Sequence, residues 1–267
     1  MGDHGNCPPV PWQAILMART GNRVAYPWRI VMPGYWLFVT LHVMAGALAL
    51  GCFWAAAWLR KGSPRHRAVG KVFLLAMTLI VLTSVPITVQ FAWYRQQPLS
   101  ALFLVYLMAL TGNALWLSWR AVTDKRDWRV LVARPGWALS LWPMLLSAIA
   151  VLAVGLGIGQ PLFVAFSSIG LWAGWRMWRF ARRGPQRADW ALRQHYQSML
   201  GAGIATHVAF FSIGMRPVWR WLQAHLSVPA VVIELFPWLV PVAVAVLASC
   251  WLERRYGRSR SAAATSR

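Results

Sequence analysis

Residues 137–180 read WALSLWPMLLSAIAVLAVGLGIGQPLFVAFSSIGLWAGWRMWRF, and no charged side chain occurs in this stretch before Arg176. A helix needs about 20 apolar residues to cross the hydrocarbon core of a bilayer, so the stretch is long enough for two crossings. Glycine and proline mark turns, and they gather between Gly155 and Pro161. We therefore expect two membrane-spanning helices here, Trp137–Gly157 and Pro161–Phe180.

Five further apolar segments of similar length flank this pair. They are Tyr35–Leu59, Val69–Tyr94, Leu99–Trp119, His195–Met215 and Val228–Trp251. The composition agrees with them, since 58% of the 267 residues are hydrophobic, only 12% are charged and the mean hydropathy is +0.48. Roughly a quarter of the residues are charged in soluble domains. The sequence predicts an all-α integral membrane bundle of seven transmembrane helices within residues 35–252.

The basic residues predict how the bundle is oriented. The chain has 27 Lys and Arg against 6 Asp and Glu, and 21 of the 27 lie in or beside the connections that follow the first, third and fifth spans or in the tail after the seventh. Cytoplasmic loops of membrane proteins are enriched in Lys and Arg. We expect residues 1–34 to be an extracytoplasmic segment and residues 253–267 to be a basic cytoplasmic tail. The Ser, Ala, Thr and Arg of that tail predict a lack of regular structure.

The same basic loops predict the partners and the location of the protein. A basic chain often binds nucleic acid, but nucleic-acid-binding proteins are not this apolar. Anionic lipid headgroups are the partners that suit basic loops beside apolar spans. We therefore expect a multi-pass protein of the bacterial cytoplasmic (inner) membrane that contacts anionic lipid and no nucleic acid.

Four histidines are candidate functional residues, because ionisable groups within membrane spans are costly and usually serve a function. His42 and His207 each lie about two turns inside the outer end of a span, so we expect them at similar depth. His66 precedes the second span in a loop, and His195 opens the sixth span, both on the cytoplasmic side. Two pairs of imidazoles at two depths are typical of a membrane cytochrome with two bis-histidine haems. The sequence thus predicts haem b and an electron-transfer role, with a quinone or redox partner.

The spacing of these histidines leaves plainer roles open. Gly46 and Gly203 each lie four residues from a histidine and leave space for a flat macrocycle or, equally, for close helix packing. Twelve residues separate His195 from His207, which is about 120° of helical rotation, so the two do not share a face. Hydrogen bonds within the membrane or contacts with lipid headgroups are the alternative roles.

A second constellation uses two of the same residues. Glu234 is the one acidic residue well within a span, and it lies near the outer end of the seventh span. At that depth it would meet His42 and His207, and two histidines with a carboxylate suit a transition metal or a proton relay. A partnership between Glu234 and Arg216 or Arg220 is the structural alternative.

Several short segments resemble a known family. His42 is followed by residues 45–51 (AGALALG), then by residues 66–71 (HRAVGK), residues 195–201 (HYQSMLG) and the pair 210–211 (FF). This pattern resembles the bacterial multi-pass family called domain of unknown function 2306, over roughly residues 35–215. The family has no assigned activity, so the resemblance implies only a set of signature positions. These are His42, His66, His195 and Met199.

The sequence leaves three functional classes open. They are a haem-binding electron-transfer protein, a transporter or metal-handling protein that uses the His and Glu cluster, and a non-catalytic membrane module. No phosphate-binding glycine loop, GxSxG or HExxH motif is present. Whether the chain is an enzyme is therefore left open.

Overall fold

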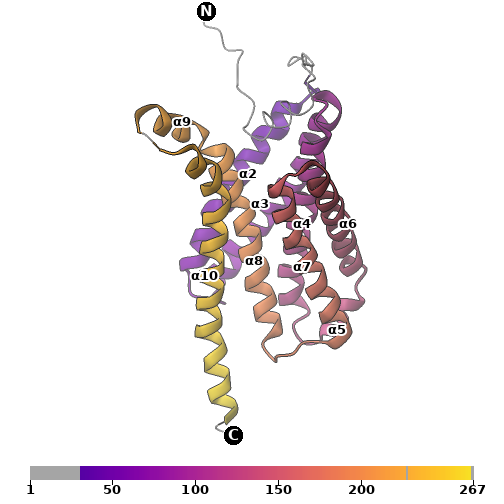
Figure 1. Ribbon diagram of the computed structural model, residues 1–267. Helices are drawn as coiled ribbons and strands as arrows, with labels where there is room; N and C mark the ends of the chain where they lie inside the picture. Colours follow the sequence, from indigo (N-terminus) through magenta and orange to yellow (C-terminus); the bar gives the residue numbers. More distant parts are fainter. Residues whose placement is uncertain (1–30, 227, 266–267) are drawn as a thin grey trace, which may run out of the picture.

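The computed structural model describes residues 31–226 and 228–265, and every regular element in these ranges is helical (Figure 1). The elements are α2 (Tyr35–Trp58), α3 (Pro64–Val89), the π-type turn η1 (Gln90–Tyr94), α4 (Pro98–Thr123), α5 (Trp128–Ala133), α6 (Pro135–Ile158), α7 (Pro161–Arg183), α8 (Trp190–Ala209), the π-type turn η2 (Phe210–Gly214), α9 (Arg216–His225) and α10 (Ala230–Thr265). The expected all-α class is confirmed for these residues. The predicted N-terminal segment falls mostly on residues 1–30, which lie outside the described residues.

Five helices are long and apolar enough to cross a membrane, which marks the chain as a membrane protein. They are α2, α3 with η1, α4, α6 and the part of α10 from Leu235 to Arg255. A sixth is added if α8, η2 and α9 together form one bent span. The remaining expected span is the 23-residue helix α7, which is less apolar because four arginines lie in its second half.

Several expected boundaries change for local reasons. Helix α3 begins at Pro64 instead of Val69, because the hydroxyl of Ser63 accepts a hydrogen bond from the amide of His66 and proline favours the first helical position. His66 therefore lies in a helix, and its expected place in a loop was wrong. The expectation that the C-terminal tail lacks regular structure was also wrong. Helix α10 continues to Thr265, in keeping with the high helix propensity of the Ala and Arg residues in the tail.

Successive long helices run in alternating directions, so every second connection lies at the same end of the molecule. The basic connections share one of these ends. Figure 1 shows α5, the α7–α8 connection and the C-terminus at one end of the molecule, and α9 at the other. The turn between α6 and α7 is as expected, with Gly159 in the left-handed conformation (φ 64°) and Pro161 at the start of α7. Helix α4 is central, because it packs against α3, α6 and α8.

A tyrosine of α4 hydrogen-bonds to the backbone of α7. The phenol of Tyr106 donates to the carbonyl of Phe166 (2.6 Å) and accepts from the amide of Gly170 (3.1 Å), two groups that are four residues apart on one face of α7. Tyr106 has no exposed surface. A Cβ added to Gly170 would lie 2.9 Å from the Tyr106 ring and 3.1 Å from the Cβ of Ala148 in α6. Gly170 is therefore the point where α4, α6 and α7 meet.

We predict that Gly170→Val destabilises the bundle, because neither the anchored phenol nor Ala148 can move away from the added methyl groups. Overpacking of this kind costs about 1–3 kcal/mol, so the thermal unfolding midpoint of the detergent-solubilised protein should fall. Gly157→Val is the matched control, because nothing lies within 4 Å of a Cβ at Gly157. Equal midpoints for the two variants would contradict the packing described here.

An acidic residue holds the connection between α4 and α6. Asp124 ends α4, and its carboxylate accepts hydrogen bonds from Arg120 (2.8 and 2.6 Å) and from Arg134 (2.9 and 3.2 Å). Burial by itself raises the pKa of Asp124, but the hydrogen bonds and charges of the two guanidinium groups outweigh burial and hold this pKa below its usual value. The ionised carboxylate therefore fixes α5 and the start of α6.

This arrangement predicts a loss of stability in acid. A carboxyl whose pKa is lower in the folded state stabilises the fold above its unfolded pKa, about 3.9, and loses that contribution as the pH falls through the folded value. Asp124→Asn should lower the unfolding free energy at pH 7 by about 1–3 kcal/mol, the usual worth of hydrogen bonds to a charged group. Thermal unfolding of both proteins at pH 7 and near pH 3 tests this, because the difference between them should shrink in acid. A difference independent of pH would show that the charge is irrelevant.

Candidate functional site

Two of the four candidate histidines, His66 and His195, lie at the same level of the bundle. His66 lies in the first turn of α3 and His195 in the second turn of α8, and both side chains are half-buried. The two helices touch where the hydroxyl of Thr206 donates to the sulfur of Met77 (3.1 Å), and each histidine lies eleven residues before its helix's residue in that contact. The fold therefore brings to one end of the bundle two histidines that are 129 residues apart in the chain.

The α2–α3 turn sets the orientation of His66. The Nδ1 atom of His66 lies 3.1 Å from the carbonyl oxygen of Ala56, near the end of α2. The Nζ atom of Lys61 donates to the same oxygen (2.8 Å) and to the carbonyl of Ala57 (2.6 Å). Lysine near a helix C-terminus satisfies carbonyls that have no partner within the helix. Burial lowers the pKa of Lys61, because the charged ammonium group loses contact with water in this turn.

His195 is oriented in the same way by a third helix. Its Nδ1 atom lies 3.0 Å from the carbonyl oxygen of Ser118 in α4. A carbonyl oxygen only accepts hydrogen bonds, so Nδ1 carries the proton in both His66 and His195. In the neutral form each ring then has its lone pair on Nε2. Histidines that bind metals are held in this manner, with one nitrogen on a backbone carbonyl and the other on the metal.

The surroundings of this pair favour an anionic group. Arg65 and Arg67 flank His66, and Lys61 lies one turn away across the α2–α3 connection. Gly70 follows His66 by one helical turn, and nothing lies within 4 Å of a Cβ placed on it. The pair thus combines two imidazoles, several cations and free space on one helix face. These features suit an iron ligated by two imidazoles whose macrocycle carries carboxylate groups.

The structure does not bring His42 and His207 together. The Nδ1 atom of His42 lies 3.0 Å from the hydroxyl of Thr83. The Nε2 atom of His207 accepts from the indole of Trp54 (2.9 Å), which lies twelve residues, or about 18 Å, beyond His42 along α2. The expectation of equal depth was wrong because α2 meets α8 through its last turns, where the ring of Phe53 covers Gly203.

His207 is also fully occupied. Its Nδ1 atom lies 2.7 Å from the carbonyl oxygen of Gly203, and Nε2 takes the hydrogen bond from Trp54. The rings of Phe53 and Trp54 pack against the imidazole edge to face, with centroids 5.2 and 5.7 Å away. Neither nitrogen remains for iron, so a haem on His42 and His207 does not fit this arrangement. Intramembrane hydrogen bonding, the plainer alternative, describes both residues.

The metal-ion alternative loses its geometric basis for a related reason. It requires His42, His207 and Glu234 in one place, and the first two are separated. The side chain of Glu234 in α10 lies outside the described residues. Within the described part of the chain, no three His, Cys, Asp or Glu residues are grouped closely enough to hold a metal ion.

A polar cluster that sequence reasoning missed joins α7, α8 and α10. Glu253 accepts hydrogen bonds from Arg193 (2.6 Å), Tyr196 (3.4 Å) and Gln197 (3.4 Å), and Gln197 accepts one from Arg176 (2.6 Å). The signal was present in the sequence, since Arg193 and Glu253 are opposite charges expected at the same end of neighbouring spans. At 100° per residue these α8 residues lie about 100–200° around the helix from His195, so the cluster holds the side of α8 that faces away from this histidine.

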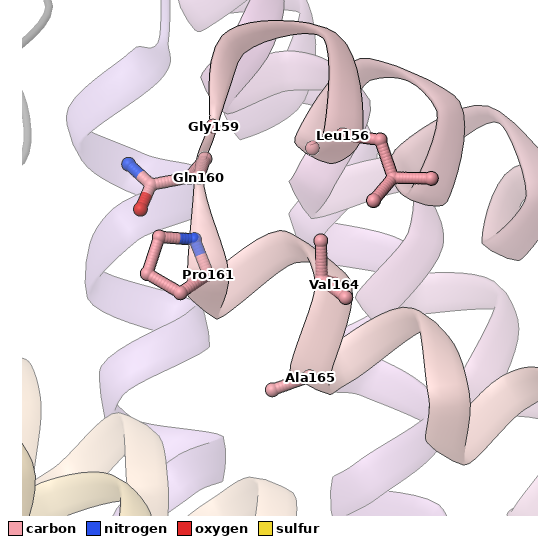
Figure 2. A pocket seen from close by; sticks show the side chains of 7 residues that line it. Leu156, Gly159, Gln160, Pro161, Val164 and Ala165 are labelled. Carbon is pink, nitrogen blue, oxygen red and sulfur yellow. The ribbon is translucent and has the colours of Figure 1, made fainter.

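A shallow concavity of the described chain lies away from His66 and His195. It has a volume of about 530 Å³ and is formed at the α6–α7 turn, at the opposite end of these helices (Figure 2). Gln160 supplies the one polar side chain, and the other lining residues are apolar or glycine. The lining residues are Gly155, Leu156, Gly159, Gln160, Pro161, Val164 and Ala165. This concavity offers no titratable group, so it does not compete with His66 and His195 as a chemical site.

Comparisons with protein-family models, with curated proteins and with solved structures gave no match. The resemblance to domain of unknown function 2306 therefore stays a prediction.

Proposed function

We propose that the chain crosses a bacterial inner membrane seven times, with its N-terminus outside and its C-terminus in the cytoplasm. The five or six apolar helices and the gathering of basic connections at one end support this topology. It requires α7 and the α8–η2 pair to cross as well. Together these two segments lie between the apolar helices α6 and α10 in the chain. If only one of them crossed, basic connections would lie on both sides of the membrane, and if neither crossed, the arginine-rich α7–α8 connection would lie outside.

The arginines of α7 are compatible with a crossing. Each of three arginines lies over the ring of a tryptophan four residues earlier, with distances of 4.8, 5.5 and 5.7 Å to the ring centroid. The pairs are Arg176–Trp172, Arg179–Trp175 and Arg182–Trp178. Arginine beside an interfacial tryptophan directs its charge toward the headgroups while its stem covers apolar surface. The second half of α7 therefore suits the cytoplasmic interface of the bilayer.

We also propose that His66 and His195 hold haem b and that the protein transfers electrons in the membrane. The observation that carries this proposal is the anchoring of two imidazoles, from α3 and α8, on backbone carbonyls at one end of the bundle, so that each keeps Nε2 as its remaining ligand atom. Haem would supply one-electron chemistry, and its carboxylates would find Lys61, Arg65 and Arg67 nearby. A quinol is the electron donor that suits a redox group close to a bilayer.

The topology predicts which connections face each side. In a cysteine-free background, a cysteine at Gln160 should react with a membrane-impermeant maleimide on intact cells whose outer membrane is opened. A cysteine at Lys125, which is exposed beside α5, should react only after the inner membrane is permeabilised. The opposite pattern, or equal labelling of both positions in intact cells, would overturn the proposed orientation.

The haem proposal predicts which histidines matter. The detergent-purified protein, expressed with ample haem supply, should show a Soret band that shifts on dithionite reduction. His66→Leu and His195→Leu should each lose nearly all of the bound haem, because both imidazoles would be needed to hold it. His42→Leu and His207→Leu are the matched controls and should retain the spectrum.

Other outcomes separate the remaining possibilities. A colourless protein that binds no added haem would overturn the redox proposal, and metal analysis of that preparation would then test the metal-handling alternative. Loss of haem in the His42 or His207 variants alone would place the ligands elsewhere. Size-exclusion profiles of every variant distinguish loss of a ligand from loss of the fold.

A further inference from the structure

Helix α9 differs from every other long element because it lies off the bundle. It has ten residues, Arg216–His225, follows η2 directly and is bent by 52° from the α8–η2 segment. None of its residues is buried. Figure 1 shows it projecting sideways from the top of α8 and α10, at the end opposite α5 and the C-terminus. In the proposed topology, on which this inference rests, the helices on both sides of α9 cross the membrane and α9 lies at the outer surface.

The sequence of α9, RPVWRWLQAH, separates into two faces. At 100° per residue, Arg216, Arg220 and Gln223 lie within about 60° of one another. Val218, Trp221 and Leu222 lie on the opposite side. A helix with a charged face and a Trp-containing apolar face is typical of a segment that lies in the plane of a membrane interface.

One tryptophan fixes the rotation of α9 about its axis. The indole of Trp219 donates to the carbonyl of Phe211 (2.6 Å), and its ring packs edge to face on Phe236 of α10, with centroids 5.4 Å apart. The side of α9 that carries Trp219 is therefore docked on the bundle. Val218 and Trp221 remain 43% and 56% exposed, and Leu226 just after the helix is 51% exposed. These exposed side chains form the apolar surface of α9.

We propose that α9 is an interfacial helix whose apolar surface binds the outer leaflet of the bilayer. Val218, Trp221 and Leu226 enter the boundary between headgroups and acyl chains, while Arg216 and Arg220 contact lipid phosphates. The occupant is phospholipid because exposed apolar side chains continue from α9 onto the adjoining ends of η2 and α10, where Phe210, Ile213, Val232 and Leu235 are exposed. The arginines match the charge of anionic lipids. Tryptophan prefers the headgroup level, where its apolar ring and its N–H group both find partners.

Spin labels on the full-length protein test this assignment. With the native cysteines replaced, a nitroxide is attached at Val218→Cys or, as the matched control on the polar face of the same helix, at Gln223→Cys. The protein is reconstituted in vesicles of phosphatidylcholine with phosphatidylglycerol. The label at position 218 should collide several-fold more with oxygen than with a water-soluble nickel chelate, and the label at position 223 should show the reverse preference.

Three other outcomes would overturn the proposal. If both labels prefer the nickel chelate, α9 lies in water. If the label at position 218 is shielded from both reagents, protein covers it, and dipolar broadening between labels would identify a second copy of this chain. If both labels prefer oxygen, α9 is the buried half of a bent span. Vesicles of phosphatidylcholine alone test the arginines, because Arg216→Gln with Arg220→Gln should abolish any dependence of label depth on anionic lipid.

Discussion

The hydrocarbon core of a bilayer offers no hydrogen-bond partners, so every backbone amide and carbonyl must be satisfied within the protein. This constraint explains why the described regular structure is helical and why the polar side chains within the spans turn back onto their own helices. Ser84, Thr88, Ser147 and Thr206 each donate to a carbonyl four residues earlier. Polar residues of these helices thus serve the backbone first, and a residue that does otherwise is a candidate for another role.

The histidines illustrate this distinction. His207 gives one nitrogen to the carbonyl of Gly203 and the other to Trp54, so the protein itself uses its whole hydrogen-bonding capacity. His66 and His195 give one nitrogen each to a carbonyl on a neighbouring helix, so each ring is oriented and still has one atom for a ligand. The difference lies in the partners of each ring and not in depth or in the residue type.

The sequence was sufficient to predict where the helices lie along the chain, but it was insufficient to predict which residues of different helices come into contact. Apolar length placed all seven expected helices, and Gly159 with Pro161 marked the α6–α7 turn, because these signals are local. The pairing of His42 with His207 failed because depth counted along each helix assumes parallel axes, whereas α2 meets α8 through its last turns. Helix α9 was taken as a plain connection, although the separation of Arg216 and Arg220 from Val218 and Trp221 was visible in the sequence. Ser63 and Pro64 are likewise a typical helix start, and they indicated that α3 begins before His66.

The hydrogen bonds of the Tyr106 phenol to Phe166 and Gly170 have a consequence for biosynthesis. A carbonyl and an amide of α7 take a polar partner from α4, so α7 reaches its final packing only against a helix that is already in place. Because the ribosome makes α4 first, the partner is waiting when α7 emerges. The order of the chain is thus also the order in which this half of the protein can be assembled.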